Sequence, residues 1–167
     1  MSISTAVVVG NPKPASRTLA AATRVAVGLT DQAPDVVVDL ATVGPGLLSW
    51  DDDAVTALVD QVGRADVVVT ACPTYKATFT GLLKLFLDRF EARPRSAVAV
   101  PLMLGAGPGH ALAPEVSLRP VLAELGFHTT RGLYVLDSTY DDPTAYDAWL
   151  AHTRPVVSAL TTAGALQ

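Results

Sequence analysis

The chain has 167 residues, with 12 lysines and arginines against 16 aspartates and glutamates, so its formal net charge is −4 at pH 7. Because the sequence has no block of basic residues, it lacks the electrostatic attraction that dominates nucleic-acid binding, and nucleic acid is not an expected partner. Half of the residues are hydrophobic, yet no apolar stretch approaches the roughly 20 residues of a membrane helix. We therefore expect one domain, residues 1–167, with no membrane partner.

The cysteine and histidine residues indicate the cellular compartment and whether a metal site is expected. The single cysteine, Cys72, cannot form an internal disulfide, and no basic and then apolar signal segment precedes the first predicted strand. Both features favour a cytoplasmic protein. His110, His128 and His152 lie far apart and lack the spacing of a metal-binding motif, so no metal site is predicted.

The secondary-structure pattern is a strand followed by a helix, five times over. The predicted strands are 3–9, 35–39, 66–72, 96–104 and 129–136, and the predicted helices are 16–29, 51–63, 80–93, 110–125 and 143–162. Valine runs such as residues 7–9 are continuous rather than alternating, which is typical of strands covered on both faces. The pattern predicts an α/β fold with a doubly wound, five-stranded parallel sheet and helices on both faces. Five strands favour the flavodoxin-like order 2-1-3-4-5.

That strand order also predicts where a ligand binds. In doubly wound sheets the ligand crevice lies at the carboxyl ends of the strands, at the point where the strand order reverses. Here that point falls between strands one and three. The loops 10–16, 73–80 and 105–110 should therefore converge, and they are also the three loops of unusual composition.

The first loop leads into a helix and is suited to one phosphate group. A helix start offers unpaired N–H groups and about half a positive charge, to which Ser16 and Thr18 add hydroxyls and Arg17 adds a cation. The Gly-Lys-Ser/Thr ending of a P-loop is absent, so a triphosphate is not expected. Alternatively, Ser16 only caps the helix and Arg17 is a solvated side chain.

The second loop leaves a buried strand abruptly at Pro73. Its backbone and Thr74 can face the heteroatoms of a planar ring, and Tyr75 can lie against the ring. Lys76 would place a positive charge near such a ring, where it would stabilise negative charge on it. A purely structural loop with a solvated lysine is the alternative.

The third loop, residues 105–110, contains enough glycine for its backbone to touch a ligand. Its spacing is G-x-G-x-G, and it follows the fourth strand instead of opening the first strand-to-helix turn. A Rossmann dinucleotide site is therefore not indicated. The loop either binds a ligand with Gly105, Gly107 and His110 or simply makes a turn.

Together the three loops resemble the NAD(P)H-dependent FMN reductase family, especially the small flavin reductases that serve two-component alkanesulfonate monooxygenases. Residues 73–84 are similar to the family's P-x-Y-K-x-x-x-x-G-x-L-K flavin loop, and residues 118–122 to its L-[KR]-P-V-L segment. The similarity runs through about residues 10–137. It implies FMN with NADPH or NADH, hydride transfer from the reduced nicotinamide to FMN, and a homodimer or homotetramer.

The resemblance also assigns roles to individual residues. It implies phosphate contacts from Ser16, Arg17 and Thr18. It implies ring contacts from Pro73, Thr74, Tyr75 and Lys76, and contacts on the pyrimidine and ribityl side from Gly105, Gly107 and His110. Because hydride transfer needs little acid–base chemistry, no catalytic side chain is expected.

Three functions stay open at this point. The first is a flavin reductase that supplies reduced flavin to a partner monooxygenase. The second is an enzyme that keeps its FMN and reduces quinones or azo compounds with NAD(P)H. The third is a flavodoxin-like electron carrier without a nicotinamide site, against which the cationic Arg17 and Lys76 argue, because flavodoxins surround their flavin with acidic residues.

Overall fold

The computed structural model describes residues 3–93 and 95–164. Within them, one parallel sheet has the path β2-β1-β3-β4-β5, with β6 also paired to β4. The strands are β1 (Thr5–Val9), β2 (Val36–Asp39), β3 (Val67–Pro73), β4 (Val98–Gly105), β5 (His128–Thr129) and β6 (Leu133–Leu136). The α/β class and the flavodoxin-like strand order predicted from the sequence are confirmed.

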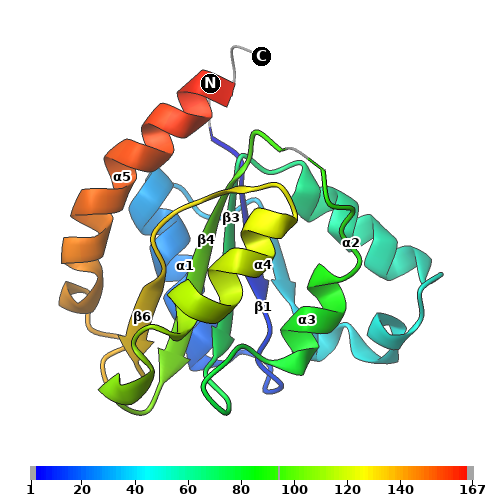
Figure 1. Cartoon of the computed structure of the whole chain (residues 1–167), viewed down its shortest axis with the longest axis horizontal. Helices are drawn as coiled ribbons and strands as arrows, with labels where there is room; N and C mark the ends of the chain where they lie inside the picture. The colour runs from blue at the N-terminus through cyan, green and yellow to red at the C-terminus, as the bar shows by residue number, and fades with distance from the viewer. Residues whose placement is uncertain (1–2, 94, 165–167) are drawn as a thin grey trace.

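Helices cover both faces of the sheet, as Figure 1 shows. They are α1 (Arg17–Thr30), α2 (Asp53–Gly63), α3 (Gly81–Leu87), α4 (Arg119–Glu124) and α5 (Thr144–Gly164), with short turns η1 (Leu40–Thr42), η2 (Gly44–Leu48), η3 (Pro108–His110) and η4 (Pro114–Leu118). Residues of α1 and α5 share one buried cluster with the sheet, and residues of α2, α3 and α4 share the other. The sheet is therefore the middle of three layers.

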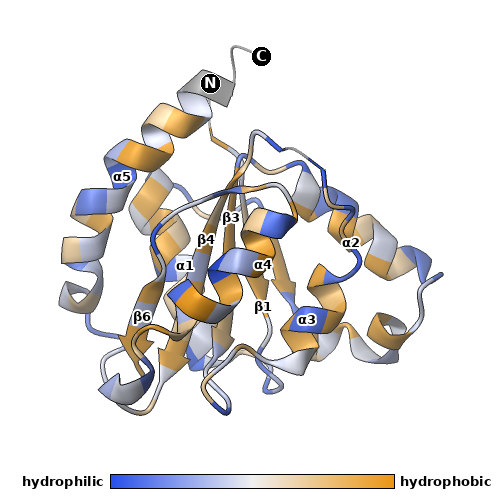
Figure 2. Ribbon diagram, viewed as in Figure 1, coloured by the Kyte–Doolittle hydropathy of each residue, from blue (hydrophilic) through white to orange (hydrophobic). Residues whose placement is uncertain are grey.

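Continuous apolar strands supply both layers of the core. Successive side chains of a strand point to opposite faces; in β1, Ala6 and Val8 pack toward α2 and α3, while Val7 and Val9 pack toward α1. Figure 2 shows the central strands as hydrophobic along their length, with polar residues on the outer sides of the helices. None of the described helices combines the length and apolar character needed to cross a membrane.

The predicted fifth strand is two short strands rather than one. β5 and β6 both pair with β4 and are separated by Thr130, Arg131 and Gly132. The N–H of Gly132 donates to the Glu115 carboxylate at 3.0 Å, and a Cβ at Gly132 would lie 2.9 Å from Pro114. The chain is held against η4 at this point, which takes it out of the ladder.

The prediction of one continuous helix over residues 110–125 is also wrong. It consists of the 3₁₀ turn η3, the π-helical turn η4 and the α-helix α4. Pro120 has no N–H to donate to the preceding turn, so the α-helical ladder cannot continue through it. Instead the N–H of Arg119 bonds to the carbonyl of Pro114, five residues back, which is the spacing of a π-bulge.

The third helix is shorter than predicted and packs mostly within the chain. It ends at Leu87, beyond which the N–H groups of Arg89 and Phe90 bond to carbonyls three residues back. The Arg89 side chain donates to the carbonyls of Ser49 and Trp50. Of the large apolar residues in the predicted helix 80–93, Leu82 is half-buried and Leu85 is exposed. The others are buried within the chain: Leu83, Phe86, Leu87 and Phe90.

Candidate functional site

The three predicted loops begin at neighbouring positions on the carboxyl edge of the sheet. β1 and β4 both pair with β3, so the ends of these strands lie side by side. The N–H of Gly10 donates to Ala71 at 2.8 Å, and the N–H of Thr74 donates to Leu104 at 2.6 Å. Each loop is therefore tied to the strand next to it, and the convergence expected from the strand order is present.

The first loop is shaped by its own polar side chains. The Asn11 amide donates to the Thr18 hydroxyl at 2.9 Å, and its oxygen accepts from the N–H of Lys13 at 2.9 Å. Ser16 caps α1 by accepting from the N–H of Leu19 at 3.2 Å. The N-terminus of α1, with its partial positive charge, thus opens toward the edge of the sheet.

Gly10 and Thr80 clamp the first loop to the second. The Thr80 hydroxyl donates to the Gly10 carbonyl at 2.6 Å and also accepts from the N–H of Leu83 at 3.2 Å, which caps α3. A Cβ on Gly10 would lie 2.4 Å from the Cβ of Leu83. Only glycine therefore lets β1 and α3 approach so closely.

The second loop is a tight turn that projects from the protein. Tyr75 and Thr78 pair with each other through two backbone hydrogen bonds of 3.0 and 3.2 Å. Between them, Lys76 and Ala77 both have positive φ, 53° and 66°, a conformation that is uncommon without glycine and that tends to persist at functional sites. The turn carries Tyr75, which is 52% exposed, at the mouth of the crevice.

The third loop rests on Tyr134 of β6. The Tyr134 hydroxyl donates to the Gly107 carbonyl at 2.6 Å, and a Cβ on Gly105 would lie 2.1 Å from that hydroxyl. Burial and the nearby Asp137 carboxylate raise the pKa of Tyr134, so the phenol stays protonated and can keep donating. Gly105 thus leaves room for the side chain that holds its own loop.

A cavity of about 390 Å³ opens between the first two loops. Its lining residues are Asn11, Lys13, Ala15, Ser16, Arg17, Thr18, Ala20, Pro73, Tyr75, Asp137 and Tyr140. Five of the residues predicted from the sequence lie together here: Ser16, Arg17, Thr18, Pro73 and Tyr75. The volume falls within the range of small-molecule sites.

The other five predicted residues do not line this cavity: Thr74, Lys76, Gly105, Gly107 and His110. The N–H of Thr74 donates to the carbonyl of Leu104, and Gly105 and Gly107 belong to the loop that Tyr134 supports. Lys76 occupies the tip of its turn. His110 lines a separate hollow of about 290 Å³ with Ala77, residues 108–113 and Val116.

A fourth loop, which follows β6, was missed in the sequence. Arg17 lies over the ring of Tyr140, with 5.9 Å between the guanidinium carbon and the ring centroid, and its Nη1 is 3.5 Å from the carbonyl of Asp137. The N–H of Asp137 donates to the Gly105 carbonyl at 2.9 Å. The rule that placed the other loops, carboxyl ends of parallel strands at one edge, would also have indicated this one.

The cavity fits a phosphate joined to a planar polar ring. The cations Lys13 and Arg17 lie beside the α1 N-terminus, where an anion is stabilised. Next to Pro73, which lines the cavity, the hydroxyl of Thr74 is buried and lacks a hydrogen-bond partner among the described residues. The two cations and the aromatic ring of Tyr75 suit FMN.

The described residues near the cavity include no cluster suited to a metal ion and no exposed thiol. The described residues include no group of three or more histidine, cysteine or acidic side chains placed to hold a metal. Cys72 is fully buried in β3, and burial raises the pKa of its thiol to about 12.

Cys72 should therefore resist alkylation in the folded protein. At pH 8.5 about half of the thiols in an unfolded chain are ionised, against roughly one in 3,000 for a thiol with a pKa of about 12. We expect iodoacetamide to label Cys72 rapidly in urea and hardly at all in buffer, as read by mass spectrometry. Rapid labelling of the native protein would contradict its burial.

Comparison with known proteins identifies relatives of this arrangement. The family model described as NADPH-dependent FMN reductase matches residues 3–142. An FMN reductase (NADPH) of Escherichia coli K12 is 36% identical over 77 residues, which cover 46% of this chain and 40% of that enzyme. The NADH-dependent FMN reductase SfnF of Pseudomonas putida is 34% identical over 84 residues, which cover 48% and 44%. The matches thus span less than half the length of these curated relatives.

Solved structures extend the similarity to nearly the whole chain. The apo form of an NADH:FMN oxidoreductase (EMOB) superposes with a TM-score of 0.80 at 27% identity, over 96% of this chain and 89% of that chain. An NAD(P)H:quinone oxidoreductase from Methanothermobacter marburgensis superposes with a TM-score of 0.66 at 16% identity, over 94% and 95%. The second likeness shows a shared fold alone.

Proposed function

The chain belongs to the NADPH-dependent FMN reductase family, and from that premise we propose that it transfers hydride from a reduced nicotinamide to FMN. The observation that carries this proposal is the cavity in which the α1 N-terminus, with Ser16, Arg17 and Thr18, faces Pro73 and Tyr75. In this proposal the cationic residues would form a phosphate subsite, and Pro73 with Tyr75 would form a ring subsite. Relatives are named for NADPH and for NADH, so either nucleotide is a candidate donor.

In this proposal the protein binds and orients its ligands and moves no proton. Arg17 and the α1 N-terminus would hold the FMN phosphate, with Lys13 as a further cation. Pro73, Thr74 and Tyr75 would position the ring, and Lys76 would place positive charge near it. Gly105, Gly107 and His110 would approach from the neighbouring strand. Bound FMN supplies the hydride-accepting chemistry, and the chain contributes geometry and charge.

Anaerobic absorption spectroscopy tests the function directly. FMN would be titrated into the purified protein, and NADPH or NADH would then be added without oxygen. We expect saturable FMN binding followed by loss of the visible absorbance of the oxidised flavin at a rate well above that of free FMN. A protein that neither binds FMN nor accelerates its reduction would contradict the proposal. FMN that stays bound through purification, with rapid turnover of an added quinone, would instead indicate the FMN-retaining reductase.

Replacing Arg17 by glutamine should weaken FMN binding by about 10- to 100-fold, because a hydrogen bond to a charged group contributes about 1.5–3 kcal/mol. Riboflavin, which has no phosphate, should lose little affinity. Fluorescence titration of both flavins checks this. Arg154→Gln is the matched control, since Arg154 pairs with Asp31 beyond the end of α1. Equal losses for FMN and riboflavin would contradict a phosphate role for Arg17.

We also propose a cytoplasmic homodimer or homotetramer, whose reduced flavin passes to a flavin-dependent monooxygenase. Exposed apolar side chains support the assembly: Leu112 and Val116 are 69% and 67% exposed beside the hollow that His110 lines. Light scattering coupled to size exclusion measures the assembly. The monooxygenase partner rests on the resemblance of the flavin loop to reductases of two-component systems.

A further inference from the structure

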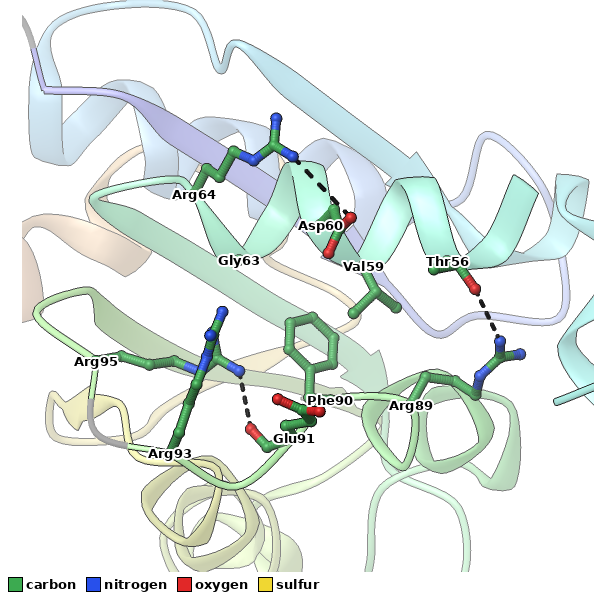
Figure 3. A pocket seen from close by; sticks show the side chains of 10 residues that line it. All are labelled: Thr56, Val59, Asp60, Gly63, Arg64, Arg89, Phe90, Glu91, Arg93 and Arg95. Atoms are coloured by element: carbon green, nitrogen blue, oxygen red, sulfur yellow. Dashed lines mark hydrogen bonds and ion pairs between the residues drawn. The ribbon is translucent and has the colours of Figure 1, made fainter. Parts of the chain in front are cut away.

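A second groove lies at the amino end of the sheet, away from the flavin cavity. It is about 420 Å³ in volume and runs between α2 and the segment that follows α3, as Figure 3 shows. Its lining residues are Thr56, Val59, Asp60, Gly63, Arg64, Arg89, Phe90, Glu91, Arg93 and Arg95. A hollow of about 270 Å³ continues it past Arg64, Arg93 and Ser96.

This groove is remote from the proposed chemistry. Arg64 closely precedes β3, whereas Pro73, which lines the flavin cavity, ends that strand. Six steps of about 3.3 Å make the strand roughly 20 Å long. A ligand in the groove would therefore not touch a flavin bound at the other edge.

Two of the four arginines are fixed in place by the protein. Arg95 donates to the carbonyls of Leu125 and Glu91 at 3.1 and 2.9 Å, and its guanidinium carbon lies 5.4 and 5.1 Å from the ring centroids of Phe90 and Phe127. Arg89 donates to the Thr56 hydroxyl at 3.2 Å and to backbone carbonyls. These arginines form a preorganised cationic wall.

The other two arginines are little neutralised. Arg64 approaches Asp60 only to 4.0 Å, with both side chains more than 60% exposed. Arg93 makes no hydrogen bond or ion pair within the described part of the chain, and its side chain enters the groove beside Arg95 (Figure 3). Burial lowers the pKa of Arg95, the like charge of Arg93 lowers it further, and the nearby Glu91 carboxylate opposes both effects in part. A bound anion would add to the partial compensation that Glu91 gives these guanidinium groups.

The charge of the groove is opposite to that of the whole protein. Four arginines and two acids, Asp60 and Glu91, give it a local charge of about +2, whereas the chain carries −4. Guanidinium forks match phosphate oxygens bidentately. Val59 and Phe90 add an apolar side on which an organic group can rest.

We propose that this groove binds a pyrophosphate-bearing organic anion of nucleotide size, with Arg64 and Arg93 contacting the phosphates. The volume suits a small molecule rather than a protein surface. The bound anion would bridge Arg93 and Arg95 and relieve their repulsion. This proposal does not depend on the flavin site, and the two proposals are tested separately.

Isothermal titration calorimetry with inorganic pyrophosphate, and with ADP as the organic form, tests the proposal. We expect saturable one-to-one binding of both, with ADP the tighter, at least tenfold weaker in Arg93→Gln and in Arg64→Gln and unchanged in Arg154→Gln. Thermal melting of each variant establishes that it is folded. Amide shifts at Gly63 and Arg95 on titration should place the ligand in the groove.

Several outcomes would overturn the assignment. Absence of saturable binding would do so. An equal loss of affinity in Arg154→Gln would also do so, because it would indicate that the anion is attracted by positive side chains of the surface in general and not by the groove. If Arg17→Gln lost affinity for pyrophosphate and Arg93→Gln did not, the anion would lie in the flavin cavity. Binding of a polyglutamate peptide without binding of pyrophosphate or ADP would make the groove a protein-docking surface instead.

Discussion

Replacing Gly105 by alanine should raise the FMN dissociation constant by tenfold or more. The new Cβ would lie 2.1 Å from the Tyr134 hydroxyl and 2.9 Å from its ring, so Tyr134 must move and release the Gly107 carbonyl. Overpacking costs about 1–3 kcal/mol, and restoring the loop conformation that binds FMN against about 1.4 kcal/mol of that cost lowers the affinity tenfold. Flavin fluorescence titration measures the change.

Two variants make the Gly105 result specific. Gly109→Ala changes the same loop where a Cβ meets nothing within 4 Å, so it should bind FMN as the native protein does. Tyr134→Phe loses the same hydrogen bond, so its effect and that of Gly105→Ala should be less than additive in the double variant. Native affinity in Gly105→Ala would mean that the third loop does not contact the flavin.

Replacing Gly10 by alanine should destabilise the whole protein by about 3 kcal/mol or more. The added Cβ would lie 2.4 Å from the Cβ of Leu83 and 3.0 Å from its Cα. Neither atom is the end of a flexible side chain, so β1 and α3 must separate and the bond from Thr80 to the Gly10 carbonyl is strained. Urea denaturation followed by circular dichroism gives the free energy of unfolding.

Gly81→Ala is the matched control for Gly10. Gly81 begins α3, one residue beyond Thr80, and a Cβ there meets nothing within 4 Å. Alanine has the higher helix propensity, so this variant should be as stable as the native protein or up to about 1 kcal/mol more stable. If Gly10→Ala unfolded at the same urea concentration as the native protein, the close contact between β1 and α3 would be disproved.

The fold was predictable because its central strands are continuously apolar and regularly spaced along the sequence. Valine runs such as residues 67–69 indicated strands buried on both faces, and five strand–helix units left few possible orders. The irregular parts depend on contacts between distant residues. The break before β6 follows from the bond of Gly132 to Glu115, which no local pattern indicates, whereas the π-turn before Pro120 has a cause visible in the sequence.

The site was predictable to the extent that it follows from sheet geometry. Loop composition pointed to Ser16, Arg17 and Tyr75, which the structure brings to one cavity. Asp137 and Tyr140 have no distinctive motif, and only their position after the last strand indicates them. Lys13 also lines the cavity, but nothing in the sequence shows which way its side chain points.

The central claim is that loops from three adjacent strands form one FMN site, and amide chemical-shift mapping tests it most directly. An isotope-labelled sample would be titrated with FMN while backbone amide signals are followed. We predict the largest changes at residues 11–18, 74–78 and 105–110, with Gly63 and Arg95 unaffected. Changes confined to the arginine groove, or none at saturating FMN, would contradict the account.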